Sequence, residues 1–594
     1  MTGEMRQVLA RLGFFVAQLA TDLSALRGWR RYLAAFLAGA LSVVALAPFG
    51  FPFILFLSFP VLVWLLDGAA RLEDRRDRLK QAALLGWLFG FGYFLLGLYW
   101  IGVAFFVEAE KFALLSPLAI IGLPAGLAFF PAAAAAAAQL YWRPGYARVL
   151  ALAIAWALSE WLRGHILTGF PWNMVGEALA ASDGLLQIGA LIGAYGLTFL
   201  AVAIFAAPAA QSSPSMTGPA KPGQATQASS ETGSFAFWKP SVAALMVLAL
   251  LWVGGTLRLA TANGTPAPGA PGAPGTQGTQ GTPGDQITVR IVQPNVQQQD
   301  KWRPENRSAI LGQYLRMSAA GNKQEPSGLA GIDMLIWPEA ALPFLMAREP
   351  FVMSAIANML PPGTVLVTGA MRAEADAEAP SGELSRFFNS IFVISSDGKI
   401  LSAYDKAHLT PFGEYLPFKE ALSAIGLETL VNLKGSLDFG PGPRLLELPG
   451  LPTAAPLICY EIIFPGIIPR NGARPGWILN VTNDAWFGDT AGPHQHFLQA
   501  RLRAVEEGLP VIRSAGNGIS GVIDAYGRVG PSLALNQAGI IDSQLPPVAV
   551  QTLYMWSGDI GLVLFLIIAG VFLYMKNYSS HYEEKSFVAS KTLE

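Results

Sequence analysis

The only cysteine of the chain follows an apolar run that predicts a buried strand. The run covers 454–458 and delivers Cys459 to its C-terminal end. In open α/β folds, the carboxyl ends of strands are where catalytic groups are usually mounted. A thiolate is a strong nucleophile, and a neighbouring base or cation can generate it from the thiol. A free cysteine is also a common core residue, so the interpretation of Cys459 as a nucleophile depends on the rest of the chain.

A carboxylate and an ammonium group follow two other predicted strands. Residues 333–337 read as a strand that Pro338 ends, which leaves Glu339 at its mouth. The Asp-Gly pair at 397–398 predicts a hairpin turn, and the second strand of that hairpin runs out at Lys406. Glu339 is a candidate base for the thiol proton. Lys406 is a candidate for stabilising the thiolate and the oxyanion of a tetrahedral intermediate.

Three motifs containing these residues resemble the Glu-Lys-Cys signature of the nitrilase, or carbon-nitrogen hydrolase, superfamily. The motifs are Ile336-Trp337-Pro338-Glu339, Tyr404-Asp405-Lys406 with Pro411-Phe412-Gly413-Glu414-Tyr415, and Ile458-Cys459-Tyr460-Glu461. They occur in family order within roughly 286–548, about half of the chain. With the membrane segments described below, the whole chain is similar to the apolipoprotein N-acyltransferases, which carry out the last step of bacterial lipoprotein maturation. The resemblance implies a four-layer αββα sandwich and a catalytic triad of Glu339, Lys406 and Cys459.

The resemblance also implies roles for residues around the triad. It makes Glu414 a second acid that orients the lysine and the substrate. Tyr460 is a candidate oxyanion donor through its backbone N–H, and Glu461 follows it as a further supporting residue. The residues implied to face the substrate are Trp302, Trp486, Phe487 and Glu506. Ordinary packing is the alternative role for the three aromatic residues, and a solvated charge on a helix surface is the alternative for Glu506.

Further strands are predicted in the same part of the chain. They cover 287–293, 365–368, 391–395, 399–404, 477–481, 511–514 and 519–524. Because apolar strands alternate with helical stretches, the sequence predicts an α/β domain.

The histidines bear on a competing chemistry, since a Cys-His pair would define a different class of hydrolase. The five histidines are His165, His408, His494, His496 and His581. Three of them lie close to the signature in sequence, so a Cys-His hydrolase stays open as an alternative. The pair at 494 and 496 is predicted to lie in a loop. No H-E-x-x-H or paired-cysteine spacing is present, so we expect no metal and no cofactor.

The composition indicates a membrane protein. Of the 594 residues, 52% are hydrophobic and 14% are charged, which is too apolar for an ordinary soluble protein. A membrane span needs about 20 mostly apolar residues. About eight segments qualify, at roughly 32–48, 51–67, 83–107, 112–141, 147–163, 184–208, 239–258 and 560–576. The net charge of −1 says nothing about partners, because the charges are segregated along the chain, and we expect no nucleic-acid partner. One cysteine excludes an intramolecular disulfide.

The distribution of basic residues predicts the orientation. Arginines and a lysine gather before the first segment and after the second, at Arg6, Arg11, Arg27, Arg30, Arg31, Arg71, Arg75, Arg76, Arg78 and Lys80. We therefore expect a multi-pass protein of the bacterial cytoplasmic (inner) membrane, with both termini in the cytoplasm and the catalytic domain in the periplasm. Asp22 and the lack of a small-residue cleavage site argue against a removable signal peptide.

Composition also divides the chain. We predict a membrane domain with seven spans over 1–260, a Gly/Pro-rich linker over 261–285 and a nitrilase-like catalytic domain over 286–548. A C-terminal span over 557–577 and a cytoplasmic tail over 578–594 complete the chain. A second low-complexity stretch, 209–236, predicts a flexible cytoplasmic loop.

The resemblance implies transfer of a fatty acyl chain from a phospholipid, through a thioester on Cys459, to the α-amino group of a diacylglyceryl-cysteine at the N-terminus of an apolipoprotein. The partners are the phospholipid donor, the apolipoprotein acceptor and membrane lipids, and the protein is expected to be a monomer. Residues 163–172 resemble a family motif and predict a loop at the lipid entrance. Two alternatives remain: a membrane-anchored amidase that uses water as acceptor, and a non-catalytic transporter or assembly scaffold. The predicted segments hold almost no charged residues, which argues against a transport path.

Overall fold

The computed structural model describes residues 3–107, 109–211, 235–262, 286–321, 328–375, 384–418, 420, 436–470 and 472–591. It divides into two compact units, and each is described by itself. The membrane unit comprises Met1–Tyr99, Pro117–Arg258 and Ser557–Glu594, and the catalytic unit comprises Trp100–Ser116 and Leu259–Trp556. Most of the predicted linker at 261–285 and of the predicted loop at 209–236 lies outside the described residues.

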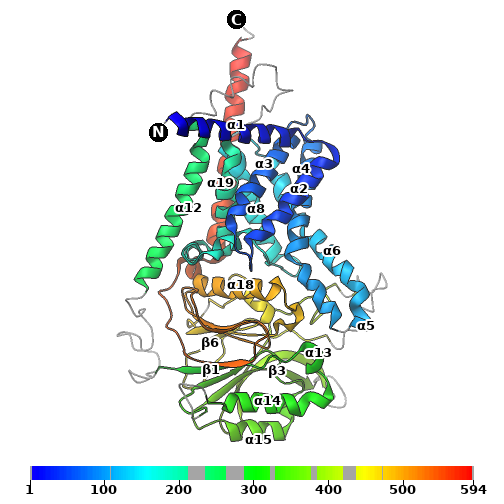
Figure 1. Ribbon diagram of the computed structural model, residues 1–594, viewed down its shortest axis with the longest axis vertical. Helices are drawn as coiled ribbons and strands as arrows, with labels where there is room; N and C mark the ends of the chain where they lie inside the picture. Colours follow the sequence, from blue (N-terminus) through cyan, green and yellow to red (C-terminus); the bar gives the residue numbers. More distant parts are fainter. Residues whose placement is uncertain are drawn as a thin grey trace. The chain divides into compact units, whose positions relative to one another are not determined.

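The membrane unit is built from helices (Figure 1). They are α1 (Gly3–Ala25), α2 (Gly28–Ser42), α3 (Leu55–Ala70), α4 (Arg75–Gly97), α6 (Ser116–Leu127), α7 (Phe129–Gln139), α8 (Tyr146–His165), α9 (Asp183–Leu186), α10 (Gly189–Phe205), α12 (Phe235–Thr261) and most of α19 (Leu553–Lys591). Helix α4 begins where the Asp74 carboxylate accepts a hydrogen bond from the Asp77 backbone N–H at 2.9 Å, which caps its N-terminus. Helix α1 runs across the ends of its neighbours in this unit rather than along them (Figure 1).

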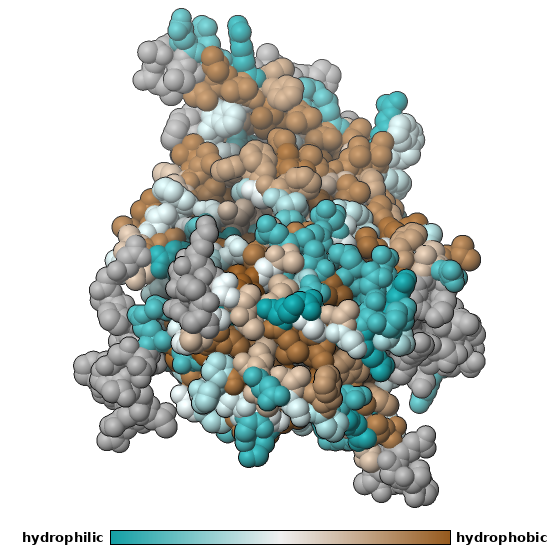
Figure 2. All heavy atoms as spheres, turned by 60° about the horizontal axis from the view of Figure 1, so that its bottom comes forward, coloured by the Kyte–Doolittle hydropathy of each residue, from teal (hydrophilic) through white to brown (hydrophobic). Residues whose placement is uncertain are grey.

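Six helical stretches in the described residues are long and apolar enough to cross a membrane. They are Gln7–Ala25, Pro52–Ala70, Arg75–Gly97, Ser116–Gln139, Phe237–Thr261 and Leu553–Val571. Five of them overlap predicted segments, whereas Gln7–Ala25 was not predicted to span. The segments expected at 32–48 and 184–208 correspond to the shorter helices α2 and α10. The number of spans stays a prediction. Hydrophobic side chains gather over the helices of this unit in Figure 2, as a lipid-facing surface requires.

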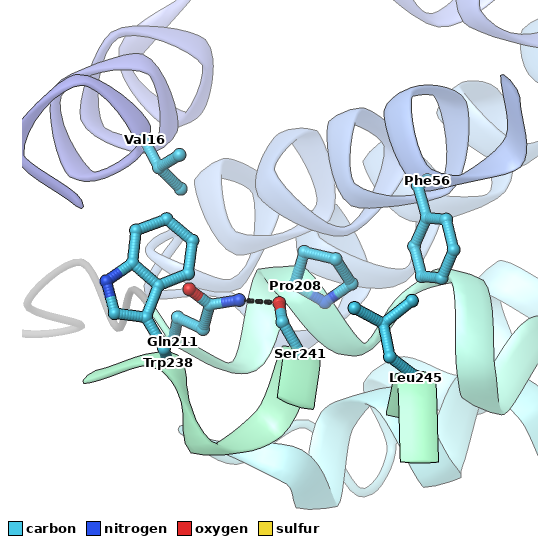
Figure 3. A pocket seen from close by; sticks show the side chains of 7 residues that line it. All are labelled: Val16, Phe56, Pro208, Gln211, Trp238, Ser241 and Leu245. Carbon is cyan, nitrogen blue, oxygen red and sulfur yellow. Dashed lines mark hydrogen bonds between the residues drawn. The ribbon is translucent and has the colours of Figure 1, made fainter. Parts of the chain in front are cut away.

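Buried charges at the ends of α3 and α8 are paired. Arg148 Nε lies 3.1 Å from Asp67 Oδ1, and both side chains are buried. A small apolar cavity of about 250 Å³ lies between α1, α3 and α12 (Figure 3). Its one polar corner holds a hydrogen bond from Gln211 to the Ser241 hydroxyl.

The catalytic unit contains two β-sheets. Their strands are β1 (Thr288–Gln293), β2 (Met334–Trp337), β3 (Val365–Ala375), β4 (Leu384–Ile394), β5 (Ile400–Asp405), β6 (Ala454–Ile458), β7 (Trp477–Thr482), β8 (Val511–Ala515), β9 (Ser520–Ile523), β10 (Val529–Leu533) and β11 (Gly539–Gln544). One sheet has the order β11-β1-β2-β3-β4-β5, and the other has the order β10-β9-β8-β7-β6. The central pairs β1·β2, β2·β3, β6·β7 and β7·β8 are parallel.

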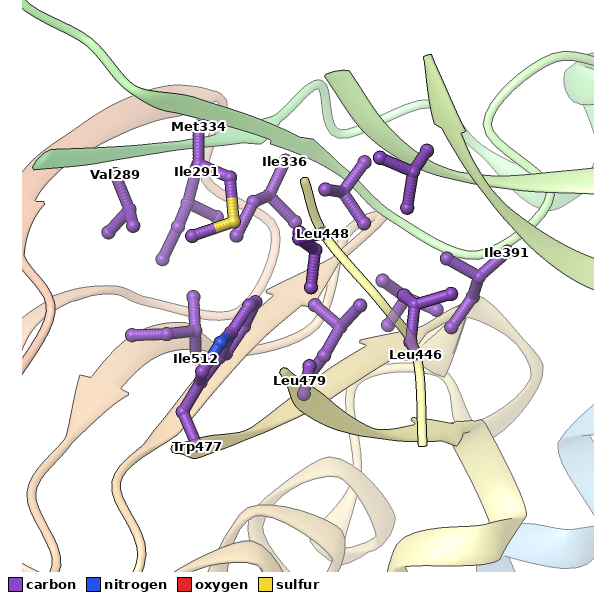
Figure 4. Packing of buried hydrophobic residues seen from close by; sticks show 14 of the residues in the cluster. Val289, Ile291, Met334, Ile336, Ile391, Leu446, Leu448, Trp477, Leu479 and Ile512 are labelled. Carbon is purple, nitrogen blue, oxygen red and sulfur yellow. The ribbon is translucent and has the colours of Figure 1, made fainter. Parts of the chain in front are cut away.

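The sheets face each other across an apolar core (Figure 4). Val289, Ile336 and Ile391 from the first sheet lie in one cluster with Leu479 and Ile512 from the second. A second cluster packs α14 (Arg307–Ala319) and α15 (Pro350–Met359) on the outer face of the first sheet, and α18 (Ala491–Glu507) lies against the second. Each fully buried aliphatic side chain contributes about 1.5–3 kcal/mol. The unit is the αββα sandwich that the resemblance implied.

The segment after α4 differs from the prediction that 83–107 forms one span. Helix α4 ends at Gly97, and Trp100–Ser116 belongs to the catalytic unit. The Trp100 indole N–H donates to Gln495 Oε1 at 3.1 Å, and its ring lies 4.6 Å from that of Phe487. Hydropathy alone cannot separate an apolar segment that crosses lipid from one that packs on protein.

Candidate active site

Strand β6 delivers Cys459 to a sharp turn, as the sequence predicted. Cys459 is the first residue of a short 3-10 helix, η9 (Cys459–Ile463), and has a φ of 48°, in the left-handed region. The side chain is 9% exposed, and the Thr482 side chain at the end of β7 hydrogen-bonds to the thiol. The thiol is therefore presented on a constrained backbone with limited access.

Lys406 lies just past β5, between two carboxylates. Its Nζ is 2.8 Å from Glu414 Oε2 and 3.9 Å from Glu339 Oε1, and the lysine side chain is 1% exposed. Asn389 Nδ2, on β4, donates to Glu339 Oε1 at 2.7 Å and to Glu414 Oε1 at 2.8 Å. At Gly369 on β3, a Cβ atom would lie 2.5 Å from Glu339 Cα, so the absence of a side chain there lets the backbone of the acid pass close. Asn389 and Gly369 are site-forming residues that carried no motif signal.

The charges of the three predicted catalytic residues affect one another. Burial raises the pKa of the Cys459 thiol, the Glu339 charge raises it further, and the Lys406 charge opposes both. Burial likewise raises the pKa of the Glu339 carboxyl, and Lys406 opposes that shift. Burial alone would lower the pKa of Lys406, but Glu414, Glu339 and Cys459 together hold it above its ordinary value. The site therefore pairs a thiol and a carboxyl of raised pKa with a permanent cation, which suits proton transfer between the first two.

Glu414 and Glu461 both hold backbone in place. Glu414 Oε2 accepts the Thr410 N–H at 2.7 Å, and Lys406 holds the pKa of its carboxyl below the usual range despite burial. Glu461 Oε1 accepts the Tyr404 hydroxyl at 2.9 Å and the N–H groups of Ala407 and His408 at 2.8 and 3.0 Å. Its Oε2 accepts the Ile458 N–H at 2.8 Å. Glu461 thus ties strand β6, which leads to Cys459, to the segment that follows Lys406.

Lys301 is a buried cation that the sequence did not single out. Its Nζ donates to the Glu339 carbonyl oxygen at 3.3 Å, and burial lowers its pKa to about 8, against the effect of Glu339. The neighbouring Trp302, implied to face substrate, is 46% exposed. The only signal for Lys301 was its position beside this tryptophan.

Of the two aromatic residues in the predicted substrate-facing loop, one is exposed and the other is packed against the protein. Trp486 is 41% exposed, whereas Phe487 packs against Trp100 and lies 5.8 Å from the His496 ring. Glu506 is fully buried on α18, where Arg503 Nη1 lies 2.6 Å from its carboxylate. The alternative of a solvated surface charge for Glu506 is therefore wrong.

The histidine pair was predicted to lie in a loop, and that prediction is wrong. His494 and His496 both lie on α18. His496 is buried, and its Nε2 lies 3.1 Å from the carbonyl oxygen of Cys459. A Cys-His hydrolase needs the ring nitrogen to take the proton from sulfur, and here Nε2 is directed at the backbone carbonyl. His496 is therefore not placed as the base for the thiol. Among the described residues, no group of three or more His, Cys, Asp or Glu side chains is arranged to hold a metal ion.

In the membrane unit, the 163–172 motif is held by a buried network. Arg163 Nη1 donates to the carbonyl oxygens of Phe170 and Trp172 at 2.5 and 2.7 Å. Glu160 accepts from the Val175 N–H at 3.1 Å and from the Thr198 hydroxyl at 2.5 Å. These bonds fix the backbone that follows α8, since buried carbonyl groups without partners would cost free energy.

Comparison with known proteins matches both units. The model of the apolipoprotein N-acyltransferase N-terminal domain matches residues 38–207, and that of the carbon-nitrogen hydrolases matches residues 288–554. The chain is 43% identical to the apolipoprotein N-acyltransferase of Rhodopseudomonas palustris, over 93% of this chain and 97% of the relative. For the enzyme of the same name from Bradyrhizobium diazoefficiens, identity is 44%, over 93% and 96% of the two chains.

Part of the chain is also similar to solved structures. An amidase of the nitrilase superfamily from Nesterenkonia AN1 is 18% identical and covers 47% of this chain and 96% of its own, with a TM-score of 0.32.

Proposed function

The chain belongs to the apolipoprotein N-acyltransferase family, and we propose from this premise that it N-acylates lipoproteins in two steps through an acyl thioester on Cys459. The acyl donor is a membrane phospholipid, and the acceptor is the α-amino group of the N-terminal diacylglyceryl-cysteine of an apolipoprotein.

One observation carries the proposal: Lys406 Nζ lies within 4 Å of both Glu339 and Glu414 and within electrostatic range of the only thiol. A cation held by two carboxylates cannot easily lose its proton, so it acts through charge. It lowers the pKa of the thiol and can stabilise the negative oxygen that forms when sulfur attacks a carbonyl group.

In the first step, Glu339 takes the proton from Cys459 as sulfur attacks the ester carbonyl of the phospholipid. The oxyanion is stabilised by the Lys406 ammonium and by the backbone N–H of Tyr460. The intermediate then collapses to the thioester, and Glu339 returns the proton to the departing lysophospholipid alkoxide. One C–S bond forms and one C–O bond breaks, so the acyl group keeps its transfer potential.

In the second step, the amine of the acceptor attacks the thioester carbonyl. Glu339 accepts a proton from the attacking nitrogen, and an amide bond replaces the C–S bond. The leaving thiolate forms beside Lys406, whose charge stabilises it, and it regains its proton from Glu339. The same three side chains therefore serve both halves of the reaction.

The membrane unit accounts for the substrates, because both donor and acceptor carry acyl chains that reside in a bilayer. The distribution of basic residues supports an inner-membrane protein with the catalytic unit on the periplasmic side and both termini in the cytoplasm. The Arg163–Trp172 segment is proposed to help form the lipid entrance, and Glu414, Tyr460, Glu461, Trp302, Trp486, Phe487 and Glu506 to support or contact the substrates. The protein is proposed to act as a monomer.

Intact-protein mass spectrometry of the purified full chain incubated with phospholipid tests this proposal. We expect a single fatty-acyl adduct that hydroxylamine removes and that a diacylglyceryl-cysteine peptide discharges with formation of its amide. Cys459→Ala is the matched control and should gain no adduct, because the chain has no other cysteine.

The other outcomes assign the chain differently. An adduct that only water discharges would identify a hydrolase. No adduct with any phospholipid, together with full function of Cys459→Ala in cells, would support the scaffold and overturn the proposal.

A further inference from the structure

The backbone of Cys459 is strained, so something must hold it. A φ of 48° is in the left-handed region, where a residue with a Cβ atom costs about 1–3 kcal/mol. Such a conformation persists only when the surrounding structure fixes the backbone. Two side chains form hydrogen bonds to the backbone around Cys459.

On the N-terminal side, Glu461 holds the backbone of Ile458, the residue before Cys459. The N–H of Ile458 donates to Glu461 Oε2 at 2.8 Å, within the same turn. On the following side, the carbonyl oxygen of Cys459 lies 3.1 Å from His496 Nε2. A carbonyl oxygen can only accept, so Nε2 carries the hydrogen and donates it. The bond from His496 therefore holds the peptide group that directly follows Cys459, and the bond to Glu461 holds the peptide group one residue further back, between Leu457 and Ile458.

The other ring nitrogen of His496 is held by a buried charged cluster. Nδ1 lies 2.9 Å from Asp484 Oδ1 and 3.1 Å from Arg513 Nη2. Arg513 Nη2 also donates to Asp484 Oδ2 at 2.8 Å, and its Nη1 donates to Asn480 Oδ1. The side chains of His496, Asp484 and Arg513 are all fully buried.

This cluster is tied to the strands around the nucleophile. Asn480 Nδ2, on β7, donates to the Leu457 carbonyl on β6 at 2.9 Å. The Thr482 hydroxyl donates to Asp484 Oδ1 at 2.9 Å, and the same side chain hydrogen-bonds to the thiol. The ring of His496, on α18, is thus fixed by Asp484, which follows β7, and by Arg513 on β8. An apolar cluster would fill this volume at a lower desolvation cost, so the charged one needs a reason beyond packing.

We propose that His496 is a positioning residue for the nucleophile: its Nε2–H holds the Cys459 carbonyl, and so keeps Cys459 in the left-handed conformation that presents the sulfur to Glu339 and Lys406. Asp484 and Arg513 orient the ring. The inference rests on the proposed role of Cys459 and goes beyond it, because it gives His496 a role that acts through a hydrogen bond to the backbone carbonyl of Cys459.

Two amide substitutions separate this role from simple packing. In His496→Gln, the side-chain amide reaches the place of Nε2 and can still donate to the Cys459 carbonyl. In His496→Asn, the shorter amide reaches only the place of Nδ1, so it keeps contact with Asp484 but loses the bond to the carbonyl. Both variants replace the imidazole with an uncharged amide, so any loss of rate or stability that comes only from removing the ring should be the same in both. His494→Gln, two residues earlier on α18, is the control.

The measurement is the single-turnover rate of Cys459 acylation by phospholipid in the full-length protein. Rates are expressed per folded molecule after Tm determination. We expect His496→Asn to lower the maximal rate about 10- to 100-fold with an unchanged lipid concentration at half-saturation, since small misplacements of a nucleophile cost this much. His496→Gln should stay within about threefold of the parent because it keeps the hydrogen bond. His494→Gln should match the parent.

Alkylation by iodoacetamide gives an independent readout, because the single cysteine makes every adduct report on this residue. The same order is expected, with His496→Asn slowest. Equal rates for the Asn and Gln variants, or the reverse order, would overturn the inference. If the parent protein takes no acyl group from any lipid, the proposed function fails, while the alkylation order still decides the role of His496.

Discussion

Glu339 and Glu461 are both buried in the catalytic unit, and the charge of Lys406 lowers the pKa of each. Their hydrogen bonds, however, differ. Glu461 accepts four hydrogen bonds, from the Tyr404 hydroxyl and from three backbone N–H groups. Among the described residues, the carboxylate of Glu339 accepts one side-chain hydrogen bond, from Asn389, and lies 3.9 Å from Lys406 Nζ. One carboxylate is saturated with donors, and the other is not.

This difference suggests that Glu461 has a structural role and Glu339 a chemical one. A carboxylate whose lone pairs are all engaged can hold strands together but has no capacity left for a proton in transit. Burial raises the pKa of both carboxyls, that of Glu461 to about 7, so it is the smaller number of hydrogen bonds that leaves Glu339 able to take a proton. Lys406 Nζ lies 3.9 Å from Glu339 Oε1, longer than a direct hydrogen bond, so Glu339 can gain and lose a proton without breaking a bond to the lysine. Substituting each glutamate by glutamine should therefore give opposite profiles of activity and stability.

The largest expected effect is on activity in Glu339→Gln. The amide keeps the shape of the side chain but cannot take a proton, so acylation of Cys459 should fall by about 10³-fold or more. The Tm should stay within a few degrees of the parent, because Lys406 keeps its closer partner Glu414 when the hydrogen bond from Asn389 and the 3.9 Å ion pair of Glu339 are altered. Single-turnover mass spectrometry and thermal unfolding in detergent measure the two quantities. Retention of more than a tenth of the acylation rate would remove Glu339 from the role of base.

The second effect is on stability in Glu461→Gln. One oxygen becomes an NH2 group that cannot accept, so at least one buried N–H or the Tyr404 hydroxyl loses its partner. We expect the free energy of unfolding to fall by about 3 kcal/mol, as for one-sided removal of a buried charged group. Tyr404→Phe removes a single donor and should cost about 1 kcal/mol. If Glu461→Gln keeps the parental Tm but loses acylation as fully as Glu339→Gln, the two glutamates are not distinct in role.

Much of the fold could be predicted because the apolar strands carry a strong local signal. Strand β6 has the predicted bounds of 454–458, and β1, β2, β5 and β7 differ from prediction by a residue or two. Strands β10 and β11 were missed. The first contains Gly530 and Pro531 and is mostly exposed, and the second is rich in polar residues. Both depend on pairing with distant strands, which periodicity does not reveal.

The site was predictable only where residue type alone suggests chemistry. The three triad residues lie at the ends of strands, so predicting the strands also predicted where these residues lie. The buried Arg513 and Asn389 did not, because arginine and asparagine are usually exposed and nothing local marks them as interior. His496 was assigned to a loop, since two histidines near glycine and proline gave no periodic apolar pattern. Its contact with the nucleophile joins residues 37 positions apart and exists only in the folded chain.

The pH dependence of thiol reactivity gives the smallest effect and the sharpest test of how the charges act. Burial raises the pKa of Cys459, the Glu339 charge raises it further, and the Lys406 charge lowers it. At neutral pH the thiol is mostly protonated, so alkylation by iodoacetamide in the parent should keep rising as pH rises through 9. We expect no plateau below that pH.

The two neighbouring charges should then act in opposite directions at pH 9, where hydroxide rather than Glu339 removes the proton. Glu339→Gln removes a negative charge, which lowers the thiol pKa and should speed alkylation severalfold. Lys406→Met removes the positive charge, which raises the pKa and should slow alkylation severalfold. Both variants should fail in acyl transfer, so only the sign of the alkylation change separates the base from the cation. A change of the same sign in both, with Tm values near the parent, would mean that packing around the sulfur rather than charge controls its reactivity.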